Sequence, residues 1–338
     1  MNRKCITILL LLLSVSLHAQ TFGEVDRKVS QYPEFASLQD LGIRIQNDFR
    51  ADSLRIRAAF TWLTQHITYD GKGEVGEHHA QRISYSSEKE KQEGIQDMVW
   101  VKINKAFRLR KGVCIDYSLM LNALFEQFGL PSRIITGVAK TEIKRLDTHP
   151  TYRNHSWNAV QLHGSWKLMD ATWASGYIDT KSNKFVRKFH DHYFFTDPAD
   201  FARHHLPANK EWQLLDQPID AATFYHAPIL LPDFCEKGIR LSSRTSGILT
   251  LSDEKENIIY FDQLPRDHLM HYTIDGSTEY RRLGFKKGEG NGYISKIRLK
   301  KRFNRPYETL TVYMNDDPIL HFRIQEDIPQ KAEAGSSK

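Results

Sequence analysis

The nine residues Arg110-Lys111-Gly112-Val113-Cys114-Ile115-Asp116-Tyr117-Ser118 place a cysteine directly after a glycine and a valine. An apolar pattern with helical spacing follows at once, carried by Tyr117, Met120, Leu121, Leu124, Phe125 and Phe128. Offsets of three and four residues predict an amphipathic helix that opens at Cys114. Gly129 is a suitable residue to end this helix, and Pro131 prevents its continuation.

A cysteine at the start of a helix lies against unpaired backbone amides and the positive end of the helix dipole, which favour thiolate over thiol. Together with a neighbouring histidine, this placement can lower a cysteine pKa from ~8.5 to roughly 3.5–7.5. Gly112 fits such a site because glycine allows a tight entry to the helix. The alternative is a small residue packed at a helix start, and this stretch alone does not decide between the two.

The surrounding sequence predicts an α+β domain, in which helices precede an antiparallel sheet. Residues 34–67 read as two helices, the second with Asp52 as its N-cap, and residues 70–90 as an exposed polar excursion. A third helix stops near Lys111-Gly112, with one face formed by Ile95, Met98, Val99, Ile103, Ala106 and Phe107. Strands are predicted at 133–138, 155–162 and 165–172.

A two-residue turn at His163-Gly164 would join the last two strands as a hairpin. That register pairs Leu162 with Ser165 and makes His155 and Asp170 diagonal neighbours on one face, with side chains within reach of each other. A three-residue loop would instead put Asp170 on the opposite face. An aspartate beside a histidine fixes the tautomer of the ring and stabilises its charged form, whereas a lone histidine at a strand start is more often structural.

Three motifs in this order, G-V-C-x-D-Y-S, H-S-W-N-A-V and W-K-L-M-D-A-T-W, resemble those of the transglutaminase-like superfamily, cysteine enzymes with a papain-like core. The resemblance covers roughly residues 50–215. It implies Cys114 as nucleophile, His155 as base and Asp170 as the group that orients the base, with a protein or peptide substrate and no cofactor. Ser156 departs mildly from the pattern, because alanine is commoner there.

The resemblance leaves the second oxyanion donor open among Tyr69, Gln96 and Trp100, and it leaves the acceptor of the acyl group open. Hydrolysis by a peptidase or amidase is the leading hypothesis, and crosslinking by a transglutaminase is the alternative. Two further hypotheses are a binding module of the same fold without turnover and a Cys114–Cys235 disulfide that would block the thiol. For Trp157 and Trp173, which flank the expected site, core packing is the favoured role.

Other features exclude several classes of function. The 47 basic and 41 acidic residues, a formal charge of +6, are spread along the chain and indicate no nucleic-acid groove. The histidine pairs at 78–79, 190/192 and 204–205 lack zinc-site spacing, so no metal is expected. We expect no stable membrane anchor, and the sequence does not indicate an oligomeric state.

The two ends and the last third of the chain complete the expected organisation. Residues 1–19 have the layout of a cleaved signal peptide, which predicts export to the periplasm or beyond the cell. The catalytic domain is then expected at 20–218. Short β-rich runs separated by turn residues predict a small β-sandwich-like domain at 219–328, and residues 329–338 are expected to be a disordered tail.

Overall fold

The computed structural model describes residues 22–72, 86–148, 152–179, 182–275, 277–300 and 305–326. The predicted signal peptide and C-terminal tail lie outside the described residues, as does most of the polar excursion at 70–90. None of the helices in the described ranges combines the length and the apolar composition needed to cross a membrane.

The chain divides into two compact units. The first runs to Gly137 and resumes at Arg153–Phe201, and the second holds Val138–Tyr152 and the chain from Ala202 onward. The domain limits expected from the sequence, 20–218 and 219–328, stay predictions.

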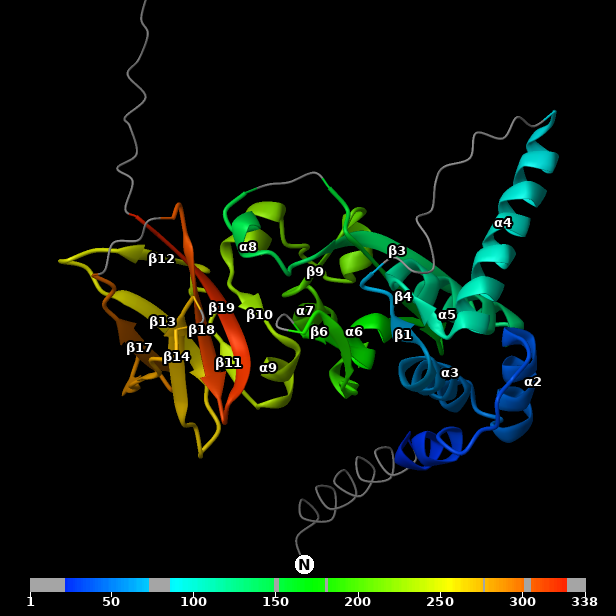
Figure 1. Ribbon diagram of the computed structural model, residues 1–338, viewed down its shortest axis with the longest axis horizontal. Helices are drawn as coiled ribbons and strands as arrows, with labels where there is room; N and C mark the ends of the chain where they lie inside the picture. Colours follow the sequence, from blue (N-terminus) through cyan, green and yellow to red (C-terminus); the bar gives the residue numbers. More distant parts are fainter. Residues whose placement is uncertain are drawn as a thin grey trace, which may run out of the picture. The chain divides into compact units, whose positions relative to one another are not determined.

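The first unit combines helices with a small antiparallel sheet. Its elements are α2 Leu38–Asp48, α3 Asp52–His66, β1 Thr68–Tyr69, α4 Glu88–Leu109, β2 Lys111–Gly112, α5 Cys114–Gln127, β3 Ser132–Ala139, β4 His155–Leu162, β5 Ser165–Met169, α6 Ala171–Ser175, β6 Gly176–Asp179, β7 Lys184–Arg187, the 3₁₀ turn Asp191–Tyr193, β8 Phe194–Thr196 and α7 Pro198–Phe201. The main sheet has the order β8-β5-β4-β3, with antiparallel neighbours throughout. Helix α5 packs against β4 (Figure 1), which brings its first turn to the sheet.

The predicted helices are present, with two corrections. The N-cap of α3 is Ala51 and not Asp52, which is the first helical residue and pairs with Arg55 at 3.3 Å. On α4, only Ile103, Ala106 and Phe107 are buried, whereas Ile95 and Met98 are exposed. The apolar face therefore continues beyond the part of the helix that packs against its unit. The predicted start of α5 at Cys114 and the left-handed Gly129 after it, with φ 76°, are confirmed.

The predicted hairpin between β4 and β5 is confirmed in its register. Leu162 pairs with Ser165 and Asn158 with Met169 across the two strands. The two turn residues, His163 and Gly164, both have positive φ, at 49° and 79°. A two-residue turn of this hand matches the twist of the strands that it joins.

The second unit is rich in β-structure. Its elements are the 3₁₀ turn Ile143–Arg145, β9 His205–Pro207, the 3₁₀ turn Lys210–Gln213, α8 Ala221–His226, β10 Ile229–Leu230, α9 Pro232–Glu236, β11 Arg240–Leu241, β12 Ile248–Leu251, β13 Asn257–Gln263, β14 Met270–Ile274, β15 Arg281–Arg282, β16 Lys286–Lys287, β17 Tyr293–Ile297, β18 Glu308–Met314 and β19 Asp317–Glu326. One sheet has the order β10-β19-β18-β14-β15, with β12 added parallel to β19, and the other has the order β11-β13-β17-β16. Both sheets contribute to one apolar core, for example through Phe261 and Phe322, so the arrangement is sandwich-like.

Candidate active site

Cys114 is the first residue of α5, and its surroundings are built by the residues on either side of it. The Asp116 carboxylate accepts a hydrogen bond from the Val113 N–H at 2.9 Å, and the Asp116 N–H donates to the Val113 carbonyl oxygen, also at 2.9 Å. This reciprocal pair fixes the entry of the chain into the helix. Asp116 therefore has a structural role as the hydrogen-bond acceptor at the start of the helix.

Gly112 allows the chain to pass close to the first turn of α5. A Cβ atom at this position would lie 2.7 Å from the Asp116 Cβ, a distance at which one backbone must move. The glycine also forms part of β2, where it pairs with Tyr69 of β1 and its carbonyl oxygen accepts from the Asp70 N–H at 2.9 Å. The glycine before the Val-Cys pair is therefore required by space and not by backbone conformation.

Tyr69 is the one of the three oxyanion candidates that the short β1–β2 pairing brings to the nucleophile. Burial raises the pKa of its phenol, and the charges of Cys114 and Asp170 raise it further. Gln96 and Trp100 are exposed on α4.

His155 opens β4 and is buried, and it pairs with Gly137 of β3. The same strand is tied to the helix of the nucleophile, because the Asn158 side-chain amide donates to the Ser118 carbonyl oxygen at 3.0 Å. The strand that carries the candidate base is thus joined to the helix that carries the candidate nucleophile.

Asp170 differs from its predicted setting. The strand expected to reach Thr172 ends at Met169, and Asp170 is instead the N-cap of the short helix α6. Its Oδ1 accepts from the backbone N–H groups of Thr172 and Trp173, at 2.9 and 3.1 Å. The physical reason is the competition of an aspartate side chain for nearby backbone amides, which ends a strand and starts a helix.

The predicted contact between His155 and Asp170 is present. Nε2 of the imidazole lies 2.6 Å from Oδ2 of Asp170, whose side chain is 1% exposed. Since Nε2 faces the carboxylate, Nδ1 is the nitrogen that remains for a reacting group. Each oxygen of Asp170 thus has one function, one capping α6 and the other orienting the ring.

The electrostatics of His155 favour the imidazolium form. Burial lowers its pKa, but the charge and hydrogen bond of Asp170 and then the hydrogen bond and charge of Cys114 outweigh it and raise the pKa to about 10. Cys114 therefore interacts directly with the ring that Asp170 holds. This combination, a cation held between a carboxylate and a sulfur, is an arrangement that can form a thiolate–imidazolium pair.

Two tryptophans enclose the imidazole. The ring centroids of Trp157 and Trp173 lie 6.1 and 5.9 Å from that of His155, and Trp173 makes an edge contact with Tyr193 at 5.5 Å. Trp157 is buried, in keeping with the core role favoured from the sequence. Their rings keep water away from the His155–Asp170 hydrogen bond, which strengthens it.

Two positioning residues were missed by sequence reasoning, although both lie inside the quoted motifs. The Tyr117 hydroxyl donates to the Ile67 carbonyl oxygen at 2.7 Å and fixes α5 to the end of α3. Asn158 provides the link to Ser118 described above. The available signal was a polar side chain on an otherwise apolar face, but its partner could not be named without the fold.

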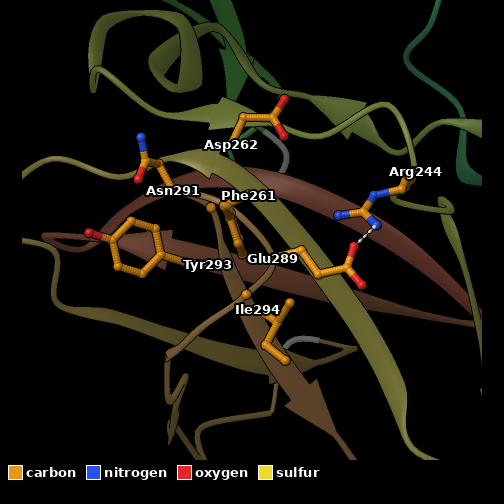
Figure 2. Close-up of a pocket in the computed structure, with 9 residues that line it drawn as sticks. Arg244, Phe261, Asp262, Glu289, Asn291, Tyr293 and Ile294 are labelled. Atoms are coloured by element: carbon orange, nitrogen blue, oxygen red, sulfur yellow. Dashed lines mark hydrogen bonds and ion pairs between the residues drawn. The ribbon is translucent and has the colours of Figure 1, made fainter.

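The second unit holds His204 and Cys235, whose ligand atoms lie within 4.8 Å of each other, and a separate hollow. A hollow of about 260 Å³ is lined by Arg244, Phe261, Asp262, Gly288, Glu289, Asn291, Gly292, Tyr293 and Ile294. Figure 2 shows the Arg244–Glu289 ion pair, at 3.4 Å, across this hollow. It has neither a cysteine nor a histidine in its lining. Neither Cys114 nor Cys235 forms a disulfide within the described residues, so the hypothesis of a blocked thiol is not supported.

Comparison with known proteins gives the class of the first unit. Residues 40–171 match the model of the transglutaminase-like superfamily. The chain therefore carries a transglutaminase-like domain, and the resemblance drawn from its three motifs is confirmed.

The similarity extends to particular proteins. Kyphoscoliosis peptidase of Mus musculus and that of Homo sapiens are each 27% identical to this chain over 275 residues. The matched region is 81% of this chain but 38% of either relative, so the chain spans well under half of their length. A solved structure described as a TGase aligns with 46% of this chain and 35% of its own, at 15% identity and a TM-score of 0.27.

Proposed function

We propose that this chain is a thiol-dependent enzyme that hydrolyses amide bonds in a protein or peptide substrate. The observation that supports it most is the buried His155, held at 2.6 Å by Asp170 through Nε2 and interacting with Cys114 through its remaining side. A histidine with a purely structural role needs only one hydrogen-bond partner. The His155 ring instead interacts with the Asp170 carboxylate on one side and with Cys114, the first residue of α5, on the other.

In the proposed reaction, the Cys114 thiolate attacks the carbonyl carbon of the amide and forms the Sγ–C bond. The proton on the His155 imidazolium passes to the nitrogen as the C–N bond breaks, and an amine leaves. Neutral His155 then takes a proton from water, whose oxygen attacks the thioester and releases the acid and Cys114. Asp170 keeps the ring in one orientation and stabilises its charged form throughout.

For the tetrahedral intermediate, we propose the backbone N–H of Cys114 and the hydroxyl of Tyr69 as oxyanion donors. Tyr69 of β1 pairs with Gly112 of β2, and Gly112 lies two residues before the nucleophile Cys114. Its raised pKa keeps the phenol protonated, and a protonated phenol is the form that can donate. Tyr69→Phe is expected to lower kcat by about tenfold or more without a matching rise in KM.

Water and a primary amine are the two possible acceptors of the acyl group. Attack by water gives a peptidase or amidase, and attack by a lysine amine gives a transglutaminase crosslink. The peptidase name of the two relatives favours hydrolysis. The chain spans only 38% of those proteins, and we propose hydrolysis for it.

We further propose that the enzyme acts after export, on the basis of the signal-peptide pattern at residues 1–19. Expression of the full chain with a C-terminal tag, followed by N-terminal sequencing of the secreted fraction, tests this. Cleavage ahead of Gln20 is expected, and an uncleaved chain retained in the cytoplasm contradicts export.

The experiment for the activity is incubation with a peptide library, with and without a primary amine, followed by mass spectrometry. We expect cleaved or deamidated products that depend on Cys114, with loss in Cys114→Ser and retention in the matched control Cys235→Ser. Products that carry the amine would show that the reaction is transamidation and not hydrolysis. Unmodified peptides under all conditions would favour the alternative of a binding module without turnover.

A further inference from the structure

Asp116 places a buried negative charge two residues after the candidate nucleophile. Its side chain is 1% exposed, and one carboxylate oxygen is engaged by the Val113 N–H at 2.9 Å. A carboxylate in the first turn of a helix is stabilised by the helix dipole. The same charge opposes the formation of a neighbouring thiolate, because like charges in a protected site disfavour each other.

Lys102 of α4 is the cation that faces this carboxylate. Its Nζ lies 3.7 Å from Oδ1 of Asp116, and its side chain is 22% exposed. Burial lowers the pKa of the Lys102 ammonium, while the charges of Asp116 and then Cys114 act in the opposite direction. The lysine is thus electrostatically coupled both to the capping carboxylate and to the nucleophile.

The charges around the sulfur show why such a cation is needed. Titratable groups from several parts of the fold act on the sulfur or on the groups beside it: Tyr69, Asp70, Lys102, Asp116, His155 and Asp170. When Cys114 is a thiolate, the sulfur and the carboxylates of Asp116 and Asp170 carry three negative charges, and the His155 imidazolium offsets one of them. Lys102 supplies a second positive charge, which offsets that of Asp116.

We propose that Lys102 is a positioning residue that neutralises Asp116, so that a carboxylate can cap the helix of the nucleophile without suppressing the thiolate. The inference rests on the proposed function. Under this proposal α4, which carries no residue of the Cys114–His155–Asp170 triad, contributes to the electrostatic environment of Cys114. Asp116 holds the Lys102 ammonium in place, and from there its charge acts on the carboxylate and on the sulfur.

The test measures the alkylation rate of Cys114 by iodoacetamide against pH, read from the Cys114 peptide by mass spectrometry. Lys102→Met is expected to slow labelling about tenfold on the acidic side and to move the midpoint of the profile up by about one pH unit. Lys102→Arg should restore the wild-type profile. Lys91→Met is the matched control, since Lys91 lies on the same helix and pairs with the exposed Glu88 at 3.1 Å, and it should leave the profile unchanged.

A double-mutant cycle separates this role from a simple tether between α4 and α5. Asp116→Asn keeps an oxygen that can accept from the Val113 N–H but removes the charge. In that background, Lys102→Met should move the midpoint by less than half of its effect in the wild type. An equal effect in both backgrounds, or no effect of Lys102→Met, overturns the proposal. If Lys102→Met does not fold, Lys102→Gln takes its place in the same cycle.

The outcome also distinguishes this inference from the proposed function. A wild-type profile that rises early and depends on His155, combined with an unchanged Lys102→Met profile, overturns the role of Lys102 alone. A wild-type profile of an ordinary thiol, unaffected by His155→Ala, overturns both.

Discussion

Replacement of Asp170 by asparagine separates the two functions of this residue. Asparagine retains an oxygen that can cap α6 through the Thr172 and Trp173 amides, but it removes the negative charge that faces His155. Burial lowers the pKa of His155, but the charge and hydrogen bond of Asp170, followed by those of Cys114, outweigh burial and raise the pKa from 6.5 to about 10, a difference of about 3.5. At 1.36 kcal/mol per pH unit this is about 5 kcal/mol in favour of the imidazolium. Loss of the larger contribution should lower the pKa of His155 by more than one unit.

The assay is NMR of a histidine-labelled sample, which follows the imidazole signals against pH in the wild type and in Asp170→Asn. The catalytic rate should fall by a factor on the order of 10² to 10⁴ even though the cap of α6 is kept. Asp220→Asn is the matched control, since Asp220 caps α8 through the Thr223 N–H at 2.8 Å. An unchanged titration of His155 in Asp170→Asn would refute the reasoning.

Three further predictions concern stability. Gly112→Ala should destabilise the fold by about 1–3 kcal/mol, because the new Cβ would lie 2.7 Å from that of Asp116, as measured by urea denaturation. Arg57→Met should cost about 3–5 kcal/mol in the same assay, since the buried guanidinium, 3% exposed, pairs with Asp26 at 2.6 Å. Burial, then the charge of Arg203, lowers the pKa of Lys140 from 10.5 to about 7. The free energy of unfolding should therefore rise with pH between pH 7 and 10.5 through this residue, and the rise should be absent in Lys140→Met.

Each of these predictions has a control and a contradicting result. Gly284→Ala adds a Cβ with no atom within 4 Å, and equal losses at the two glycines would contradict the steric argument. Arg44→Met removes an exposed pair with Asp48 and should change stability by less than about 1 kcal/mol; a loss equal to that of Arg57→Met would count against burial as the cause. For Lys140, the sign follows from its lowered pKa, because the unfolded chain binds the extra proton in that window. A pH dependence that persists in Lys140→Met would be the contrary result.

The local features of the site could be predicted because short-range rules determine them. The helix start at Cys114 follows from apolar spacing, and the β4–β5 register follows from a two-residue turn that ends in glycine. This register brings Asp170 close to His155 even though the strand ends at Met169, the residue before Asp170, and not at Thr172 as predicted. The contact was therefore predicted correctly with the wrong secondary structure around it.

The remaining features depend on tertiary contacts that no local pattern contains. The apolar face of α4 is continuous in sequence, but only its C-terminal part is buried, because burial depends on where the neighbouring helix lies. The pairing of Tyr69 with Gly112 joins segments separated by a long excursion. The Lys102–Asp116 pair likewise links two helices. A sequence pattern cannot indicate which of many lysines faces a given carboxylate.

The central claim is that His155 promotes ionisation of the Cys114 sulfur, and the most direct measurement is the pH profile of Cys114 alkylation in the wild type and in His155→Ala. We predict rapid labelling of wild-type Cys114 well below pH 8, and much slower labelling at the same pH when the imidazole is removed. Two superimposable profiles, each with the midpoint of an ordinary thiol near about 8.5, would contradict the account.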